Sequence, residues 1–104
     1  MTNQPIDRYQ LFSALGRSGA AADVDALMCH LHEQVDFTTT RLVDFGLSLV
    51  ITDEGAGRIR HYLFHGALIQ RNYAALYFKR RDEMALLNEA VAQGKIDAVQ
   101  AYAR

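Results

Sequence analysis

The chain has 104 residues, half of them apolar, and its formal net charge is -1. This length corresponds to one domain, and no stretch rich in proline, glycine or serine divides it, so we expect a single globular domain over residues 1–104. The small net charge gives no sign of a highly charged partner. No run approaches the roughly 20 apolar residues that span a bilayer, so no membrane partner is expected.

The first helix is predicted near the N-terminus, where Pro5 suits a first helical turn and apolar residues continue to the glycines at 16 and 19. A second helix is predicted from residue 23 to about 37. Its apolar side chains recur at helical spacing in one narrow stripe: Val24, Leu27, Met28, Leu31 and Val35. Three threonines at 38–40 offer capping oxygens to the segment that follows.

Residues 41–52 fit two kinds of element. Phe45, Leu47, Leu49 and Ile51 alternate as in a strand, which would make residues 42–65 a hairpin and the fold α+β. Leu42, together with Phe45 and Leu49, also fits a helix. We favour the helix, because the flanking segments are helical and a lone hairpin buries little surface.

Basic and aromatic residues are concentrated in the centre of the chain. Residues 1–53 carry a charge of -4 (three Arg/Lys, seven Asp/Glu), residues 54–81 carry +5 (six and one), and residues 82–104 carry -2 (two and four). The central segment also holds five of the ten aromatic residues. This segment is therefore the candidate functional region.

Residues 58–81 are apolar around most of a helical wheel, which predicts a helix packed on several sides and bent or broken at Gly66. The chain as a whole predicts an all-α fold, a compact bundle of five to six helices around this central apolar helix.

The C-terminal region has clear helix boundaries. Asp82 is the expected cap of a helix over 83–93, Gly94 its expected C-terminal cap, and residues 97–100 have the form of a capping box that begins a short last helix. The run from 85 to 101 resembles the helix-turn-helix of ankyrin-type repeats. The tip hairpin and the second repeat of such families are missing, so the resemblance implies a helix-turn-helix rather than a repeat array.

A stripe on the central segment is the candidate partner-binding surface. On a straight helix Arg60, Phe64, Arg71 and Phe78 lie within about 40° of one another. Arginine and aromatic residues dominate interaction hot spots, and they also stack on bases and contact phosphates. The alternative is that both phenylalanines belong to the core while the arginine stems lie along apolar surface.

Two histidines form a second candidate site. His61 and His65 are four residues apart, so on a helix both face one side, as metal-binding pairs do. Cys29, His32 and Glu33 are possible further ligands from another helix. Lys79 continues the same stripe and would repel a cation. The alternative is that the histidines mark the polar edge of the helix, and no metal or other cofactor is expected.

No catalytic motif is present: the sequence has no nucleophile elbow, phosphate-binding glycine loop or dinucleotide fingerprint. Three hypotheses follow. The first is a small protein-binding or regulatory module without catalytic activity, with self-association as one version. The second is nucleic-acid binding through residues 58–81, which the net charge of -1 and the acidic flanks disfavour. The third is metal binding through His61 and His65.

The expected location is the cytoplasm. Cys29 is the only cysteine, which agrees with a reducing compartment. The first ten residues contain neither a basic leader nor an apolar run, so they do not predict a secretory signal.

Overall fold

The computed structural model describes residues 7–103. These residues contain seven helices. They are α1 (Arg8–Ser18), α2 (Ala21–Met28), α3 (Phe37–Ser48), α4 (Asp53–His65), α5 (Leu68–Arg80), α6 (Met84–Ala92) and α7 (Ala98–Tyr102). The predicted all-α fold is confirmed. The alternative hairpin at 42–65 is wrong, because these residues belong to α3 and α4. The described residues contain one helix more than expected, since the central segment forms two.

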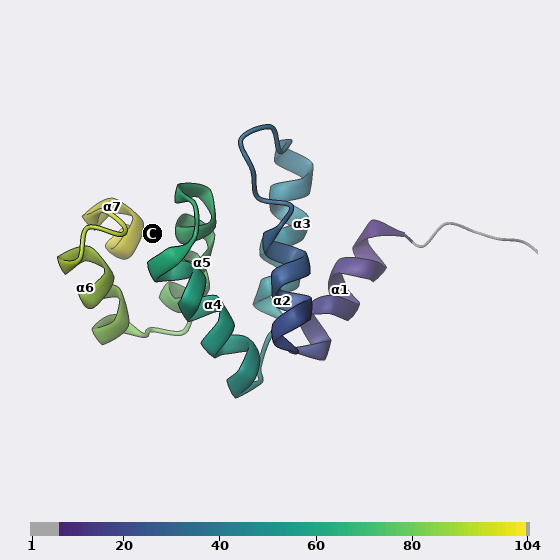
Figure 1. The fold of residues 1–104 in the computed structure, drawn as a ribbon, viewed down its shortest axis with the longest axis horizontal. Helices are drawn as coiled ribbons and strands as arrows, with labels where there is room; N and C mark the ends of the chain where they lie inside the picture. Colours follow the sequence, from purple (N-terminus) through teal and green to yellow (C-terminus); the bar gives the residue numbers. More distant parts are fainter. Residues whose placement is uncertain (1–6, 104) are drawn as a thin grey trace, which may run out of the picture.

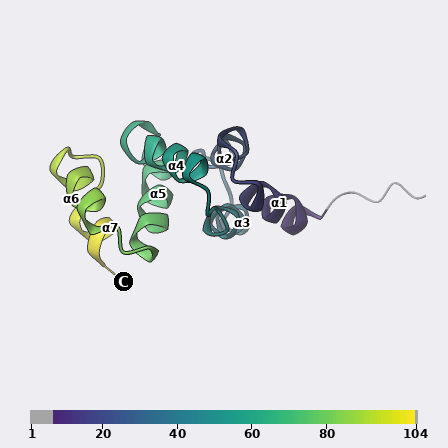
Figure 2. The same cartoon turned by 90° about the horizontal axis from the view of Figure 1, so that it is seen from below.

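Three helical hairpins lie side by side, as Figures 1 and 2 show: α2 with α3, α4 with α5, and α6 with α7. Along the row, α2 packs on α4, α3 on α5, and α5 on both α6 and α7. Helix α1 covers α2 and α3 at the N-terminal end of the row. Because the hairpins form a row, the radius of gyration, 14.0 Å, slightly exceeds the ~13 Å typical of this chain length.

Helix α1 ends as predicted, since Gly19 leaves the helix with a left-handed φ of 66°. The predicted role of Pro5 lies outside the described residues. Helix α1 contacts α3 backbone to backbone at Gly16 and Gly46. A Cβ on Gly16 would overlap the carbonyl oxygen of Gly46 and lie 2.8 Å from its carbonyl carbon. Glycine is therefore required at this crossing.

The predicted helix over residues 23–37 is wrong in its second half, because α2 ends at Met28. Residues 29–36 form a connecting loop, and Asp36 begins α3 by accepting a 2.7 Å hydrogen bond from the Thr39 amide. The cap is thus Asp36, and the threonines at 38–40 lie in the first turns of α3. Leu31 is still only 2% exposed, since the loop carries it into the core.

The central segment is two helices rather than one. Helix α4 begins earlier than predicted, where Thr52 accepts a 2.9 Å hydrogen bond from the Gly55 amide. The predicted break at Gly66 is confirmed. Gln70 fixes the break, because its Oε1 accepts from the Ala67 amide and its Nε2 donates to the Met28 carbonyl at the end of α2.

The C-terminal predictions are largely confirmed. Gly94 follows α6 with a φ of 72°, and Asp97 and Gln100 form the expected capping box at the start of α7. The predicted cap at Asp82 is wrong. This residue lies in the left-handed region, at φ 58°, and Glu83 directly precedes α6.

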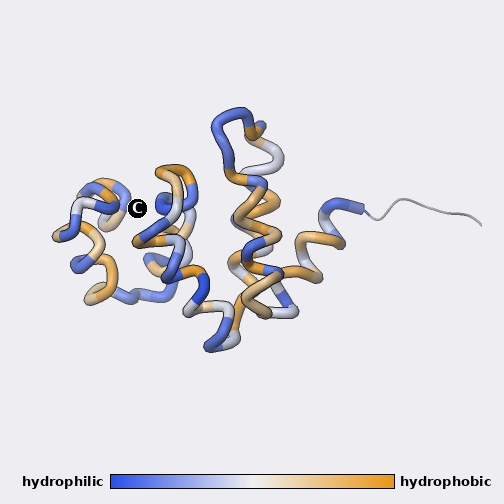
Figure 3. Tube along the Cα trace, in the orientation of Figure 1, coloured by the Kyte–Doolittle hydropathy of each residue, from blue (hydrophilic) through white to orange (hydrophobic). Residues whose placement is uncertain are grey.

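The buried apolar residues of the helices form one core cluster, whereas residues 32–34 of the α2–α3 loop are hydrophilic (Figure 3). The central segment contributes a large share of the core, as predicted: Ile59, Leu63, Phe64, Ala74, Ala75, Tyr77 and Phe78 are all buried. None of the helices within residues 7–103 combines the length and apolarity that crossing a membrane requires.

Candidate functional site: a cleft between α4 and α6

Most cations of the basic segment contact acceptors inside the protein. Arg58 pairs with Asp25 at 2.7 Å, and Arg80 pairs with Asp44 at 2.7 Å. The remaining contacts are to backbone carbonyls, made by Arg71, Lys79 and Arg81. The +5 segment and the -4 segment are therefore joined by ion pairs, and five of the six cations of residues 58–81 help to hold the helices together.

One of these contacts joins α2 to α4. Asp25 accepts hydrogen bonds from Arg58 Nε (2.7 Å) and Nη2 (3.2 Å), and a third from the Tyr62 hydroxyl (2.8 Å). The bonds from Arg58 lower the pKa of Asp25, partial burial opposes this, and the bond from Tyr62 lowers it further. The pKa of Tyr62 is raised by burial and by its bond to the carboxylate. Asp25, Arg58 and Tyr62 therefore form a structural link between α2 and α4.

A second link joins α5 to the chain after α3. The Val50 carbonyl accepts from the Tyr77 hydroxyl and from Arg81 Nη2, each at 2.8 Å. The guanidinium of Arg81 lies 3.8 Å from the centre of the Tyr77 ring, a cation–π contact. Burial raises the pKa of Tyr77, so its hydroxyl keeps the proton that it donates.

The break at Gly66 separates the predicted stripe. Arg60 and Phe64 belong to α4, whereas Arg71 and Phe78 belong to α5. Arg71 donates through Nε to the Lys95 carbonyl (2.7 Å) and through Nη1 to the Gly66 carbonyl (2.9 Å). It therefore connects the α4–α5 break to the α6–α7 turn, and the straight-helix geometry assumed for the stripe is wrong.

Three residues of the predicted stripe come together in a different way, at a cleft between α4 and α6. Two adjoining cavities of about 360 and 460 Å³ form it, and they share Gly57, Arg60 and Glu89. Phe64 lines the first cavity and Phe78 the second. Because these side chains are only 9% and 5% exposed, they belong mainly to the core and present little surface to the cleft.

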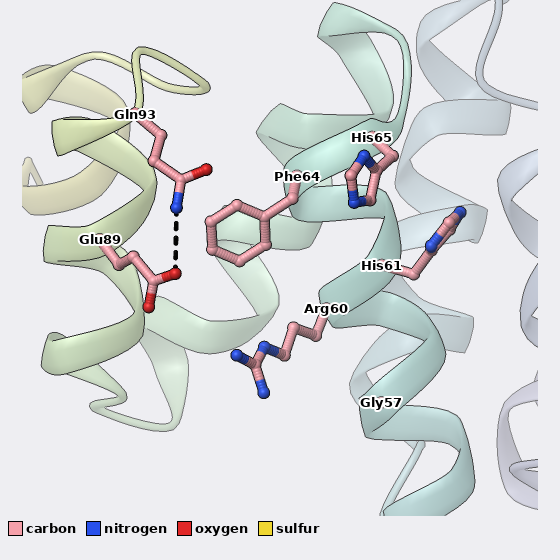
Figure 4. A pocket seen from close by; sticks show the side chains of 7 residues that line it. All are labelled: Gly57, Arg60, His61, Phe64, His65, Glu89 and Gln93. Atoms are coloured by element: carbon pink, nitrogen blue, oxygen red, sulfur yellow. Dashed lines mark hydrogen bonds between the residues drawn. The ribbon is translucent and has the colours of Figure 1, made fainter.

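The two walls of the cleft differ in charge. Figure 4 shows Arg60 and Phe64 pointing from α4 toward α6, which carries Glu89 and Gln93. Gln93 donates a 3.1 Å hydrogen bond to Glu89. Within residues 7–103, Arg60 makes neither an ion pair nor a side-chain hydrogen bond, unlike the other five cations of residues 58–81. Arg60 is thus the one cation of residues 58–81 that has no acceptor among the described residues.

The predicted histidine pair lies at the edge of the same cleft. The ring centres of His61 and His65 are 5.0 Å apart, and both residues are exposed. In Figure 4 His61 points away from α6. Across the described part of the chain, His, Cys, Asp and Glu form no group of three or more that could hold a metal ion. The pair therefore offers two ligands at most, and Cys29, His32 and Glu33 do not complete it.

A second concave surface lies between the α2–α3 loop and the start of α5. Its volume is about 760 Å³, its lining is mostly apolar, and it includes Phe37 and Leu68, which are 74% and 58% exposed. It contains no residue of the predicted stripe. We regard the α4–α6 cleft as the better candidate because the one cation of residues 58–81 without an ion pair or side-chain hydrogen bond among the described residues, Arg60, lies beside it.

Sequence reasoning missed the α6 wall of the cleft, Glu89 and Gln93, and it missed Gly57. A helical wheel relates residues of one helix, so it carries no information on which wall a later helix supplies. Comparison with protein-family models, with curated proteins and with solved structures gave no significant match for this chain.

Proposed function

We propose that this chain is a small helical protein-binding module of one domain, without catalytic activity, that binds a partner protein through the α4–α6 cleft. The observation that carries the proposal is Arg60, which lies exposed beside the cleft and has no acceptor among the described residues. Arginine is enriched among hot-spot residues, and an arginine without an internal partner does not lose a structural contact when it binds.

The predicted partner-binding residues take different parts in this proposal. Arg60 would contact the partner directly, Phe64 and Phe78 would form the floor of the cleft, and Arg71 would support it by fixing the chain at Lys95. A second copy of the chain is one version of the partner. The single cysteine agrees with a reducing location such as the cytoplasm.

Nucleic-acid binding through residues 58–81 has less support. Affinity for nucleic acids rises with the number of phosphates that cations neutralise. Five of the six cations here already contact internal acceptors, so few remain for a row of phosphates. A protein partner needs no row of free cations, because a few hot-spot residues supply most of the energy of a protein interface.

Replacing Arg60 by alanine should abolish most partner binding without affecting the fold. Loss of a hot-spot arginine costs about 2 kcal/mol or more, roughly a thirtyfold loss of affinity. The measurement is affinity capture from extracts of the cells in which the protein naturally occurs. The captured proteins are quantified by mass spectrometry for the wild type and for Arg60→Ala. Because Arg60 is exposed, unfolding of the variant should change by no more than about 0.5 kcal/mol.

The matched control is Arg17→Ala, which removes an exposed arginine from α1, far along the row from the cleft. It should capture the same protein as the wild type. Equal capture by all three proteins, or capture of none, would contradict the proposal. Recovery of RNA or DNA in place of a protein would favour the nucleic-acid alternative.

A further inference from the structure

One of the seven glycines has no structural explanation within the fold. Six of them either adopt a positive φ or lie where a Cβ would meet neighbouring atoms at less than 3.0 Å: Gly16, Gly19, Gly46, Gly55, Gly66 and Gly94. Gly57 does neither. A Cβ built on it meets nothing within 4 Å, and its φ is the ordinary negative value.

Glycine is an unfavourable residue at this position. Gly57 lies inside α4 and is exposed, so it gives the unfolded chain more freedom and adds no packing to the helix. Alanine would be the better helix former and would fit without a clash. The fold alone therefore does not account for a glycine here.

Gly57 lines both cavities of the α4–α6 cleft, one helical turn before Arg60. A glycine lets another backbone approach a helix more closely than any side chain would allow. The absence of a Cβ thus deepens the cleft next to the arginine that lacks an internal partner. The opposite wall carries two exposed carboxylates, Glu83 and Glu89, and neither forms an ion pair within residues 7–103.

We infer that Gly57 is a contact residue for a segment of the partner protein, whose backbone packs directly on α4 at this position. The charges of the two walls define the segment further. It carries an acidic side chain toward Arg60 and a basic side chain toward Glu83 and Glu89. Cavities of about 360 and 460 Å³ accommodate a few side chains, which fits a short segment rather than a whole domain. This inference rests on the proposed function of the cleft.

The first test is stability. Gly57→Ala should raise the midpoint of thermal unfolding by a few degrees, because alanine is favoured over glycine in an exposed helix and meets no neighbour here. A lower midpoint would mean that the glycine serves the fold, and the inference would be wrong.

The second test is binding, with a random dodecapeptide library displayed on phage as the probe. Peptides are selected on the full chain, and their affinities for the wild type and for each variant are then compared. Enriched peptides should contain both acidic and basic residues. Their affinity should fall severalfold with Gly57→Ala and more than about tenfold with Gly57→Leu, which fills the cleft. Ala22→Leu, the matched change at an exposed position of α2, should bind as the wild type does.

The outcomes separate the inference from the proposed function. If the selected peptides lose affinity with Arg60→Ala but not with Gly57→Leu, the cleft binds a segment and Gly57 has no part in it. If no peptide is enriched, or if neither substitution reduces binding, both the inference and the function proposed for the cleft are wrong.

Discussion

Gly16→Ala should lower the free energy of unfolding by about 3 kcal/mol, at the upper end of the usual cost of overpacking. The new methyl group would overlap the carbonyl group of Gly46, and a backbone carbonyl cannot turn away as a flexible side chain can. Helices α1 and α3 would therefore have to separate, which would disturb the stacked rings of Tyr9 and Phe45 as well. Denaturant unfolding followed by circular dichroism measures the change.

Gly57→Ala is the control for this prediction, since it makes the same chemical change in another helix. It should stabilise the protein by about 0.5–1 kcal/mol, the intrinsic preference of a helix for alanine. The two variants are thus expected to change stability in opposite directions. A Gly16→Ala protein as stable as the wild type would mean that the backbones of α1 and α3 are not in contact.

Phe78→Ala should cost about 3–5 kcal/mol, as expected for a buried phenylalanine. Its ring is 5% exposed and packs edge-on against Tyr77, with the ring centres 5.0 Å apart. Phe64, at 9% exposed, should behave similarly. Loss of partner binding by either variant could not be separated from destabilisation of the fold, which makes Arg60 the better position for testing the cleft.

Phe37→Ala is the matched control, because Phe37 is 74% exposed at the start of α3. It should change the unfolding free energy by no more than about 0.5 kcal/mol. If Phe78→Ala had an equally small effect, Phe78 would not be a core residue, and the interpretation of both phenylalanines as the floor of the cleft would be wrong.

The sequence predicts the helices best where the signals are local. Gly94, Asp97 and Gln100 act within a few residues of one another, and the α6–α7 turn has the expected form. The end of α2 was not predictable from spacing. Leu31 and Val35 continue the apolar stripe although they lie in the loop, because a loop can also deliver a side chain to the core. The competing signal was Asp36, which caps α3.

The candidate site was predictable only in part. The clustering of charge and aromatic residues identified the central segment, and the wheel selected Arg60, Phe64 and Phe78, which line the cleft. The wheel assumed one straight helix, so it also selected Arg71, which hydrogen-bonds inside the fold. It could not show which cations have internal partners, because those partners, such as Asp25 and Asp44, lie more than 30 residues away along the chain.

The structure gives the cations of residues 58–81 a different role from the one that the sequence suggests. A run of six cations first suggests a polyanionic partner. In the structure two of them pair with carboxylates of the N-terminal helices and three donate to backbone carbonyls at or beyond helix ends, so these five cations act as links between the hairpins. Our proposed binding site therefore rests on the exception, Arg60, and on Gly57, a glycine that the helix itself does not need.

The most direct test of the cleft is an NMR titration of the isotope-labelled full chain with a peptide selected as described above. We expect the largest amide shift changes at Gly57 and Arg60 of α4 and at Glu89 and Gln93 of α6, with little change in α1. Shift changes centred instead on Phe37 and Leu68, at the apolar groove beside the α2–α3 loop, would contradict the assignment of the α4–α6 cleft as the binding site.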